Sequence, residues 1–129
     1  MRTKQRNNLA ETARHERVAQ NTDVYAVKAR NYKGLRRGSP VFCRNNWHIH
    51  HKGGQILLCT AGRGYYQEWG KPAQEMKPGD VINIAPEVKH WHGAAPDSWF
   101  SHLAVEVPAE GSSNEWMEPV KEEEYSKLK

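Results

Sequence analysis

Short apolar runs separated by glycine- and proline-containing turns occupy most of the chain. Alternation of apolar and polar residues over four to eight positions is typical of half-buried strands. Strands are therefore expected at residues 22–29, 41–44, 47–51, 55–60, 65–69, 73–76, 81–84, 90–94 and 99–107. The turns include Gly53-Gly54, a glycine-rich stretch at 61–64, and residues 77–80, which suit a type II turn. The pattern predicts an all-β antiparallel sandwich or barrel with a short C-terminal helix around residues 121–128.

The first 40 residues differ from the rest in pattern and in charge. Residues 1–21 are polar with a poor apolar face, so we interpret them as a basic N-terminal extension, and the domain is expected to span residues 22–129. Residues 30–40 are basic and contain two glycines and a proline, which predicts a loop. Residues 1–40 carry a net charge of +7 and residues 41–129 one of −3. Such a basic segment can bind nucleic acid or an acidic partner, but no nucleic-acid motif accompanies it, and a solvated extension is the preferred interpretation.

The expected strand at residues 55–60 is apolar on both faces. If Gln55, Leu57 and Cys59 point into the barrel, Ile56 and Leu58 point outward. A strand that is apolar on both faces is normally covered on both. Either the N-terminal strand or a second subunit must cover it, and we favour a homodimer.

Composition limits the cellular setting. No apolar run is long enough for a transmembrane helix, so no membrane partner is expected, and no apolar segment follows the positive N-terminus, which argues against a secretory signal. The two cysteines, Cys43 and Cys59, are too few for a disulfide scaffold, and we expect both to be reduced and buried. A cytoplasmic protein fits these features best.

The histidines carry the candidate chemistry. His48 and His50 are two apart in an expected strand, so their side chains share a face, while Ile49 and His51 face away. Gln55 opens the next strand, and His90 and His92 lie on one face of a distant strand. Three imidazoles and one amide oxygen from separate strands could hold a single divalent metal. His90 and His92 share a face, so spacing alone leaves open which of them is the ligand.

These residues match the motifs of a known family. The first cupin motif, G-x5-H-x-H-x3,4-E-x6-G, matches His48, His50, Gln55 and Gly62, with glutamine in place of glutamate. The second, G-x5-P-x-G-x2-H-x3-N, matches Gly79 and His90, with Glu87 where the motif has its second glycine. The chain thus resembles a small single-domain cupin of the conserved-barrel type, over residues 41–118 above all. The resemblance implies a double-stranded β-helix, and its register selects His90 as the ligand.

Longer segments resemble one bacterial subgroup of cupins. The stretches WHIHH, GQILLCTAGRGYYQEWG, KPGDV, KHWHGAAPDSW and SHLAVEV are similar to manganese-dependent hydroxynitrile lyase-like cupins and to cupins associated with carboxymuconolactone decarboxylase-like proteins. The resemblance implies metal ligands at His48, His50, Gln55 and His90, with a catalytic residue beside the metal at His102. It also implies one divalent transition metal per chain, with manganese favoured and iron, nickel, cobalt or zinc as alternatives.

The subgroup implies a metal-dependent enzyme acting on a small organic substrate. Carbon–carbon cleavage, or proton transfer at an oxygen that the metal polarises, fits it, with His102 as the general acid or base. The ligands are neutral, so the metal is expected to keep its full charge and to favour anions. Two alternatives stay open: an O2-dependent dioxygenase or oxidase, and a metal- or ligand-binding module without catalysis.

Overall fold

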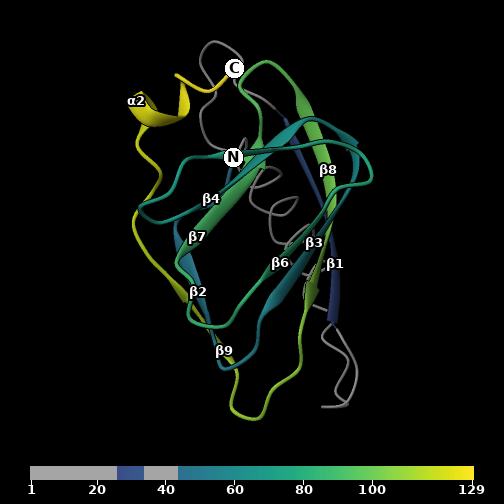
Figure 1. Cartoon of the computed structure of the whole chain (residues 1–129), viewed down its shortest axis with the longest axis vertical. Helices are drawn as coiled ribbons and strands as arrows, with labels where there is room; N and C mark the ends of the chain where they lie inside the picture. The colour runs from purple at the N-terminus through teal and green to yellow at the C-terminus, as the bar shows by residue number, and fades with distance from the viewer. Residues whose placement is uncertain (1–25, 34–43) are drawn as a thin grey trace, which may run out of the picture.

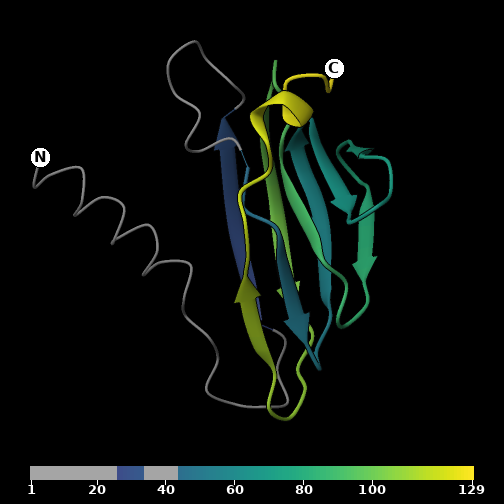
Figure 2. The same ribbon diagram turned by 90° about the vertical axis from the view of Figure 1, so that its left-hand side faces the viewer.

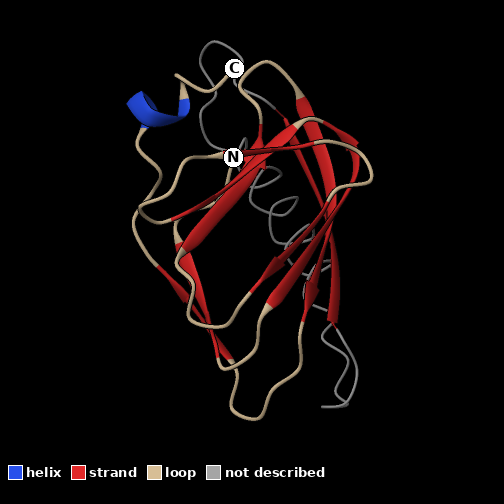
Figure 3. Ribbon diagram, in the orientation of Figure 1, coloured by secondary structure: helices blue, strands red, loops and turns tan. Residues whose placement is uncertain are grey.

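The computed structural model describes residues 26–33 and 44–129, and its regular elements are almost all strands (Figures 1 and 3). One short helix, α2 (Glu122–Tyr125), lies near the C-terminus. The strands are β1 (Ala26–Lys33), β2 (His48–His51), β3 (Gln55–Gly62), β4 (Gly64–Glu68), β5 (Gln74–Met76), β6 (Val81–Ile84), β7 (His90–Ala94), β8 (Trp99–Glu106) and β9 (Ser113–Trp116).

The strands form two antiparallel sheets that face each other. The first sheet has the order β1-β8-β3-β6 and the second has the order β5-β4-β7-β2-β9. Successive strands cross from one sheet to the other, except β4 and β5, which pair within the second sheet. Figure 1 shows the two layers on either side of the interior. This is the predicted all-β barrel of jelly-roll type, with a short C-terminal helix.

Two apolar clusters stabilise the layers. Between the sheets, Leu57, Met76, Ile84 and Phe100 belong to one buried cluster. The other lies on the outer side of the second sheet, where the segment leading into α2 runs along the strands (Figure 2). Its members are Trp47, Tyr65, Trp91, Ala95, Val120 and Tyr125. All five residues of β7 are consequently buried.

A tight crossing joins the sheets at Gly62 and Gly64. Gly62 has a φ of +74°, and a Cβ there would lie 2.0 Å from the carbonyl oxygen of Trp99. Gly64 packs against the Phe100 ring, where a Cβ would come within 2.6 Å. Both positions therefore require glycine. The predicted turn at 61–64 is in fact two strand ends separated by Arg63 alone, because β3 and β4 belong to different sheets.

Several sequence predictions hold and others are wrong. Residues 77–80 form the expected turn, in which Gly79 has a φ of +93° and the Asp80 amide donates to the Lys77 carbonyl at 2.9 Å. The loop expected from residue 30 is wrong at its start, because β1 pairs with all of β8 and continues to Lys33. The edge strand β9 was not expected, since its residues are all exposed and lack alternation. The helix is shorter than the predicted 121–128.

Some predictions fall outside the described residues. The basic extension at 1–21, residues 22–25 of the first expected strand, and Cys43 all lie there. Cys59 is described; it is buried and reduced, as expected, and burial raises the pKa of its thiol. Among the described residues, no helix has the length and apolar character needed to cross a bilayer.

Candidate metal centre

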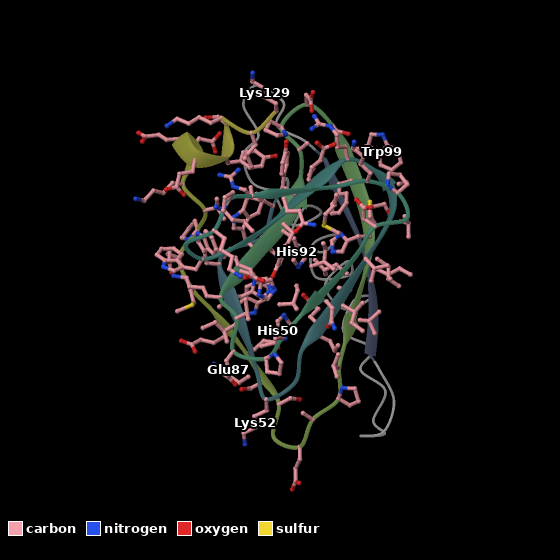
Figure 4. The ribbon with its side chains drawn as sticks, viewed as in Figure 1. His50, Lys52, Glu87, His92, Trp99 and Lys129 are labelled. Atoms are coloured by element: carbon pink, nitrogen blue, oxygen red, sulfur yellow. The ribbon has the colours of Figure 1, made fainter. Side chains whose placement is uncertain are left out.

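Three buried histidines converge between the sheets. His48 and His50 extend from β2, and His90 extends from β7, whose first residue pairs directly with His48. One potential ligand atom from each of the three lies within 4.8 Å of the others. Figure 4 shows His50 in the interior between the two layers. The HxH spacing and the distant His90 therefore meet at one point, as the sequence predicted.

Backbone carbonyls fix the orientation of two of these rings. The Nδ1–H of His48 donates to the Asn46 carbonyl at 2.9 Å, and that of His90 donates to the Val88 carbonyl at 2.8 Å. A carbonyl can only accept, so both rings carry a proton on Nδ1, and Nε2 is the nitrogen that each ring could offer to a metal. Burial lowers the pKa of His90 to about 4, so its ring is neutral at pH 7. Neutral imidazole is the form that binds a metal.

Gln55 supplies an oxygen from the opposite sheet. Its Nε2 donates to Glu106 Oε1 at 2.8 Å, and its own Oε1 is buried without a hydrogen-bond partner. Gln55 and Glu106 are directly opposed residues of β3 and β8. Glu106 also places Oε2 3.0 Å from His50 Nδ1, an electrostatic contact without the direction of a hydrogen bond.

A divalent metal fits these residues. Burying a polar atom without a hydrogen-bond partner is costly. Three such atoms lie here: His50 Nε2, His90 Nε2 and Gln55 Oε1. All three are metal-ligand atoms in ordinary protein chemistry. His48, His50, Gln55 and His90 are therefore the residues that would hold the metal.

A small, partly open cavity of about 20 Å³ lies against this group. His48, His50 and Gln55 form part of its wall. The remaining wall is polar and aromatic, formed by Asn45, His92, Glu106, Asn114 and Trp116. The cavity has room for about one water-sized molecule, and a larger substrate fits there only if the wall moves.

His92 is held by Asn45. The Asn45 Oδ1 accepts the backbone N–H of His92 at 2.9 Å, so the Asn45 Nδ2 faces the ring and approaches His92 Nε2 at 3.1 Å. The same Nδ2 lies 3.5 Å from His92 Nδ1. Because Nδ2 is a donor, the ring nitrogen that it contacts accepts, and the ring is neutral. His92 thus forms part of the cavity wall, whereas the register of the motif assigned the metal to His90.

His102 lies deeper in the interior. It is fully buried on β8, its ring centroid is 4.7 Å from that of His92, and it stacks on Phe100 at 4.9 Å. The ring centroid of His92 is also 5.6 Å from that of His48 and 6.1 Å from that of His90. His92 therefore stands between His102 and these two candidate ligands. The catalytic role assigned to His102 by resemblance stays a prediction.

His51 faces away from the centre, as the alternation predicted. Its Nδ1 lies 2.6 Å from Glu87 and its Nε2 lies 2.7 Å from Glu115; these hydrogen bonds raise the pKa of His51. Glu87 stands where the cupin motif has glycine and has a φ of +66°. Its carboxylate accepts the Lys52 amide at 2.9 Å, which helps to hold the pKa of Glu87 below its usual value and anchors a strained turn.

Glu106, Asn45, Asn114 and Trp116 were missed as site residues. Glu106 had a usable signal, because it continues the inward alternation of Phe100, His102 and Ala104 along β8. Asn114 and Trp116 had none, since they reach the site only through the pairing of β9 with β2.

Comparison with solved structures decides the family. A cupin-like protein from Thermotoga maritima has 40% sequence identity to this chain with a TM-score of 0.69, and the alignment covers 87% of this chain and 80% of the other. The chain belongs to the cupin family. No family model matches the sequence.

This cupin is also similar to a curated enzyme. The (R)-mandelonitrile lyase of Granulicella tundricola is 45% identical to it over 82 residues, which make up 64% of this chain. The match covers 62% of the lyase, so the chain spans less than two thirds of that relative. The resemblance to hydroxynitrile lyase-like cupins is thereby supported.

More distant structures share the fold alone. The DMSP lyase DddQ from Ruegeria pomeroyi has a TM-score of 0.59 at 20% identity, with 78% of this cupin and 46% of that chain covered. At that identity the likeness concerns the arrangement of strands.

Proposed function

We propose that this cupin is a metal-dependent lyase that cleaves a carbon–carbon bond in a small hydroxy compound of the cyanohydrin class. The observation that carries the proposal is the convergence of buried, unpartnered His50 Nε2, His90 Nε2 and Gln55 Oε1 beside a small, partly open cavity. The similarity to a mandelonitrile lyase suggests the substrate class. Manganese is the proposed metal, in line with the subgroup.

A divalent metal held by His48, His50, Gln55 and His90 would act as a Lewis acid toward a substrate oxygen. His102 is the proposed general base, and it receives the proton of the substrate hydroxyl by way of the His92 ring, which lines the cavity. The O–H electron pair forms a carbonyl, the bond to the nitrile carbon breaks, and cyanide leaves with that bond's electrons. His102 then returns the proton to cyanide, giving an aldehyde and hydrogen cyanide. The neutral, Asn45-held ring of His92 lines the path between His102 and the cavity.

Elemental analysis with a cleavage assay tests the proposal. The purified wild-type protein, reconstituted with Mn²⁺, is expected to hold about one metal per chain and to release benzaldehyde from (R)-mandelonitrile. His48→Ala is expected to lose both metal and activity. His102→Ala is expected to keep its metal and lose about 10²- to 10⁴-fold in kcat. Ser101→Ala, whose side chain is on the opposite face of β8, is the matched control.

The outcomes separate the competing functions. A metal-loaded protein that cleaves no cyanohydrin overturns the lyase proposal, and oxygen consumption by the same preparation would instead indicate an oxidase or dioxygenase. Full activity in His102→Ala with loss of activity in His92→Ala would move the proton-transfer role to His92.

We also propose that the protein forms a homodimer through the outer face of the first sheet. Ile56 and Leu58 on β3 lie beside Val105 and Leu103 on β8, and these four apolar side chains remain partly exposed. Light scattering after gel filtration is expected to give twice the chain mass for the wild type and one chain mass for Leu58→Asp. A monomeric wild type would overturn the dimer proposal.

A further inference from the structure

Glu106 is the acidic residue in contact with two of the four proposed metal ligands. It lies 2.8 Å from Gln55 Nε2 and 3.0 Å from His50 Nδ1. Its side chain is 21% exposed, and the residue forms part of the cavity wall. We propose that Glu106 is a positioning residue that turns the Gln55 oxygen toward the metal and supplies the negative charge that the ligands lack. This inference rests on the proposed metal site.

The orientation of Gln55 follows from hydrogen-bond chemistry. A side-chain amide has a donor end and an acceptor end, and a carboxylate only accepts. Rotating the Gln55 amide by half a turn would replace the 2.8 Å hydrogen bond to Glu106 Oε1 with a contact between two acceptor oxygens, which repel each other. The carboxylate therefore selects the orientation that leaves Gln55 Oε1 buried and directed to the centre. Outer carboxylates commonly orient metal ligands in this way.

The charge argument changes the expectation drawn from the ligands alone. Three imidazoles and an amide are neutral, so the sequence predicted a metal that keeps its full +2 charge and favours anions. The structure places a carboxylate directly behind Gln55 and His50. The cupin motif has its carboxylate at the position of Gln55. In this chain the carboxylate belongs to Glu106, the residue of β8 that pairs with Gln55 of β3. The centre is therefore less attractive to anions than its ligand list implies.

Two substitutions separate orientation from charge. Glu106→Leu removes both the acceptor and the charge, whereas Glu106→Gln keeps an oxygen that can accept from Gln55 and removes only the charge. Glu110→Gln makes the same change of charge at an exposed residue of the loop between β8 and β9 and serves as the matched control. Thermal melts of the metal-free proteins show whether each variant is folded.

Metal affinity and anion affinity are the readouts, and neither depends on turnover. In chelator competition, Glu106→Leu is expected to bind Co²⁺ about 10- to 100-fold more weakly than the wild type, with a changed visible spectrum of the bound ion. Glu106→Gln is expected to lose less metal affinity, to keep a wild-type spectrum, and to bind azide at the Co²⁺ site about tenfold more tightly. Glu110→Gln is expected to match the wild type in every measurement.

Failure of this inference is distinguishable from failure of the metal site. If the wild type binds Co²⁺ and Glu106→Leu binds it equally well with an unchanged spectrum, Glu106 has no positioning role. Unchanged azide affinity in Glu106→Gln overturns the charge argument, and the near-isosteric shape of this variant keeps that test valid if Glu106→Leu does not fold. A wild type that binds no metal overturns the proposed function and this inference together.

Discussion

The two sheets make different contributions to the centre and are covered differently. The second sheet supplies the proposed nitrogen ligands His48, His50 and His90, and its outer face is covered by the chain's own C-terminal segment. The first sheet supplies the oxygen groups of Gln55 and Glu106, and its outer apolar residues stay partly exposed in the single chain. The proposed nitrogen ligands are thus held in a strand pair enclosed on both sides, whereas the proposed oxygen ligand is oriented by a cross-strand hydrogen bond. Loss of the proposed ligand from the first sheet should therefore weaken metal binding less than loss of one from the second sheet.

The largest expected effect is on the imidazoles of the second sheet. His90→Ala removes a neutral nitrogen ligand from a strand that is buried throughout. Binding of Mn²⁺ or Co²⁺ is expected to fall at least about 10³-fold, because the remaining side chains cannot complete the site. Chelator competition measures this loss. Ile49→Ala, which changes the outward residue between His48 and His50, should bind as the wild type does; equal losses in both would contradict the assignment.

The covered outer face should matter for stability more than the exposed one. Tyr125→Ala removes a fully buried ring and the hydrogen bond from its hydroxyl to the Ala94 carbonyl at 2.8 Å. A loss of about 3 kcal/mol in the free energy of unfolding is expected. Tyr125→Phe removes only the hydrogen bond and should cost about 1 kcal/mol. Urea denaturation checks both, and a Leu58→Ala variant as destabilised as Tyr125→Ala would contradict the comparison.

Removing the oxygen ligand should weaken the metal site less than removing a nitrogen. Gln55→Leu keeps the bulk of the side chain and takes away the oxygen that faces the centre. Metal affinity is expected to fall about 10- to 100-fold, as for a single weaker ligand. The measurement is the same competition titration used for His90→Ala. A larger loss than in His90→Ala would reverse the proposed ranking of the two sheets.

The smallest effect concerns the loop that connects the sheets between β6 and β7. Glu87→Gly and Glu87→Ala both lose the contacts to His51 and Lys52, but only alanine keeps a strained φ. The glycine variant is therefore expected to be about 1 kcal/mol more stable than the alanine variant. Chemical denaturation of the pair decides it. An alanine variant that is equally stable would show that the turn relaxes.

The sequence predicted the interior of the molecule better than its edges. The inward positions of Leu57 and Cys59 and the outward positions of Ile56 and Leu58 follow from alternation alone and are found in β3. Alternation and motif spacing also predicted the convergence of His48, His50 and His90. The alternation is a local feature, because a strand has a fixed two-residue period. The convergence with His90 was predicted from the spacing of the family motif.

Features that depend on pairing between distant strands could not be predicted in this way. β1 continues through the basic residues up to Lys33 because β8 offers a partner along its whole length. β9 is a strand because β2 has a free edge, and no apolar pattern marks it. The contact between Gln55 and Glu106 likewise requires the register of β3 against β8, although their inward directions were each accessible from the sequence.

The position of Trp116 allows metal binding at the centre to be followed by tryptophan fluorescence. Its indole is 55% exposed and lies over the His48 ring, with 4.6 Å between centroids and 31° between planes. An indole that contacts a ligand of a paramagnetic ion loses fluorescence when the ion arrives. Binding of the proposed metal should therefore quench Trp116 emission, and the difference between the wild type and Trp116→Phe isolates that signal from the other four tryptophans.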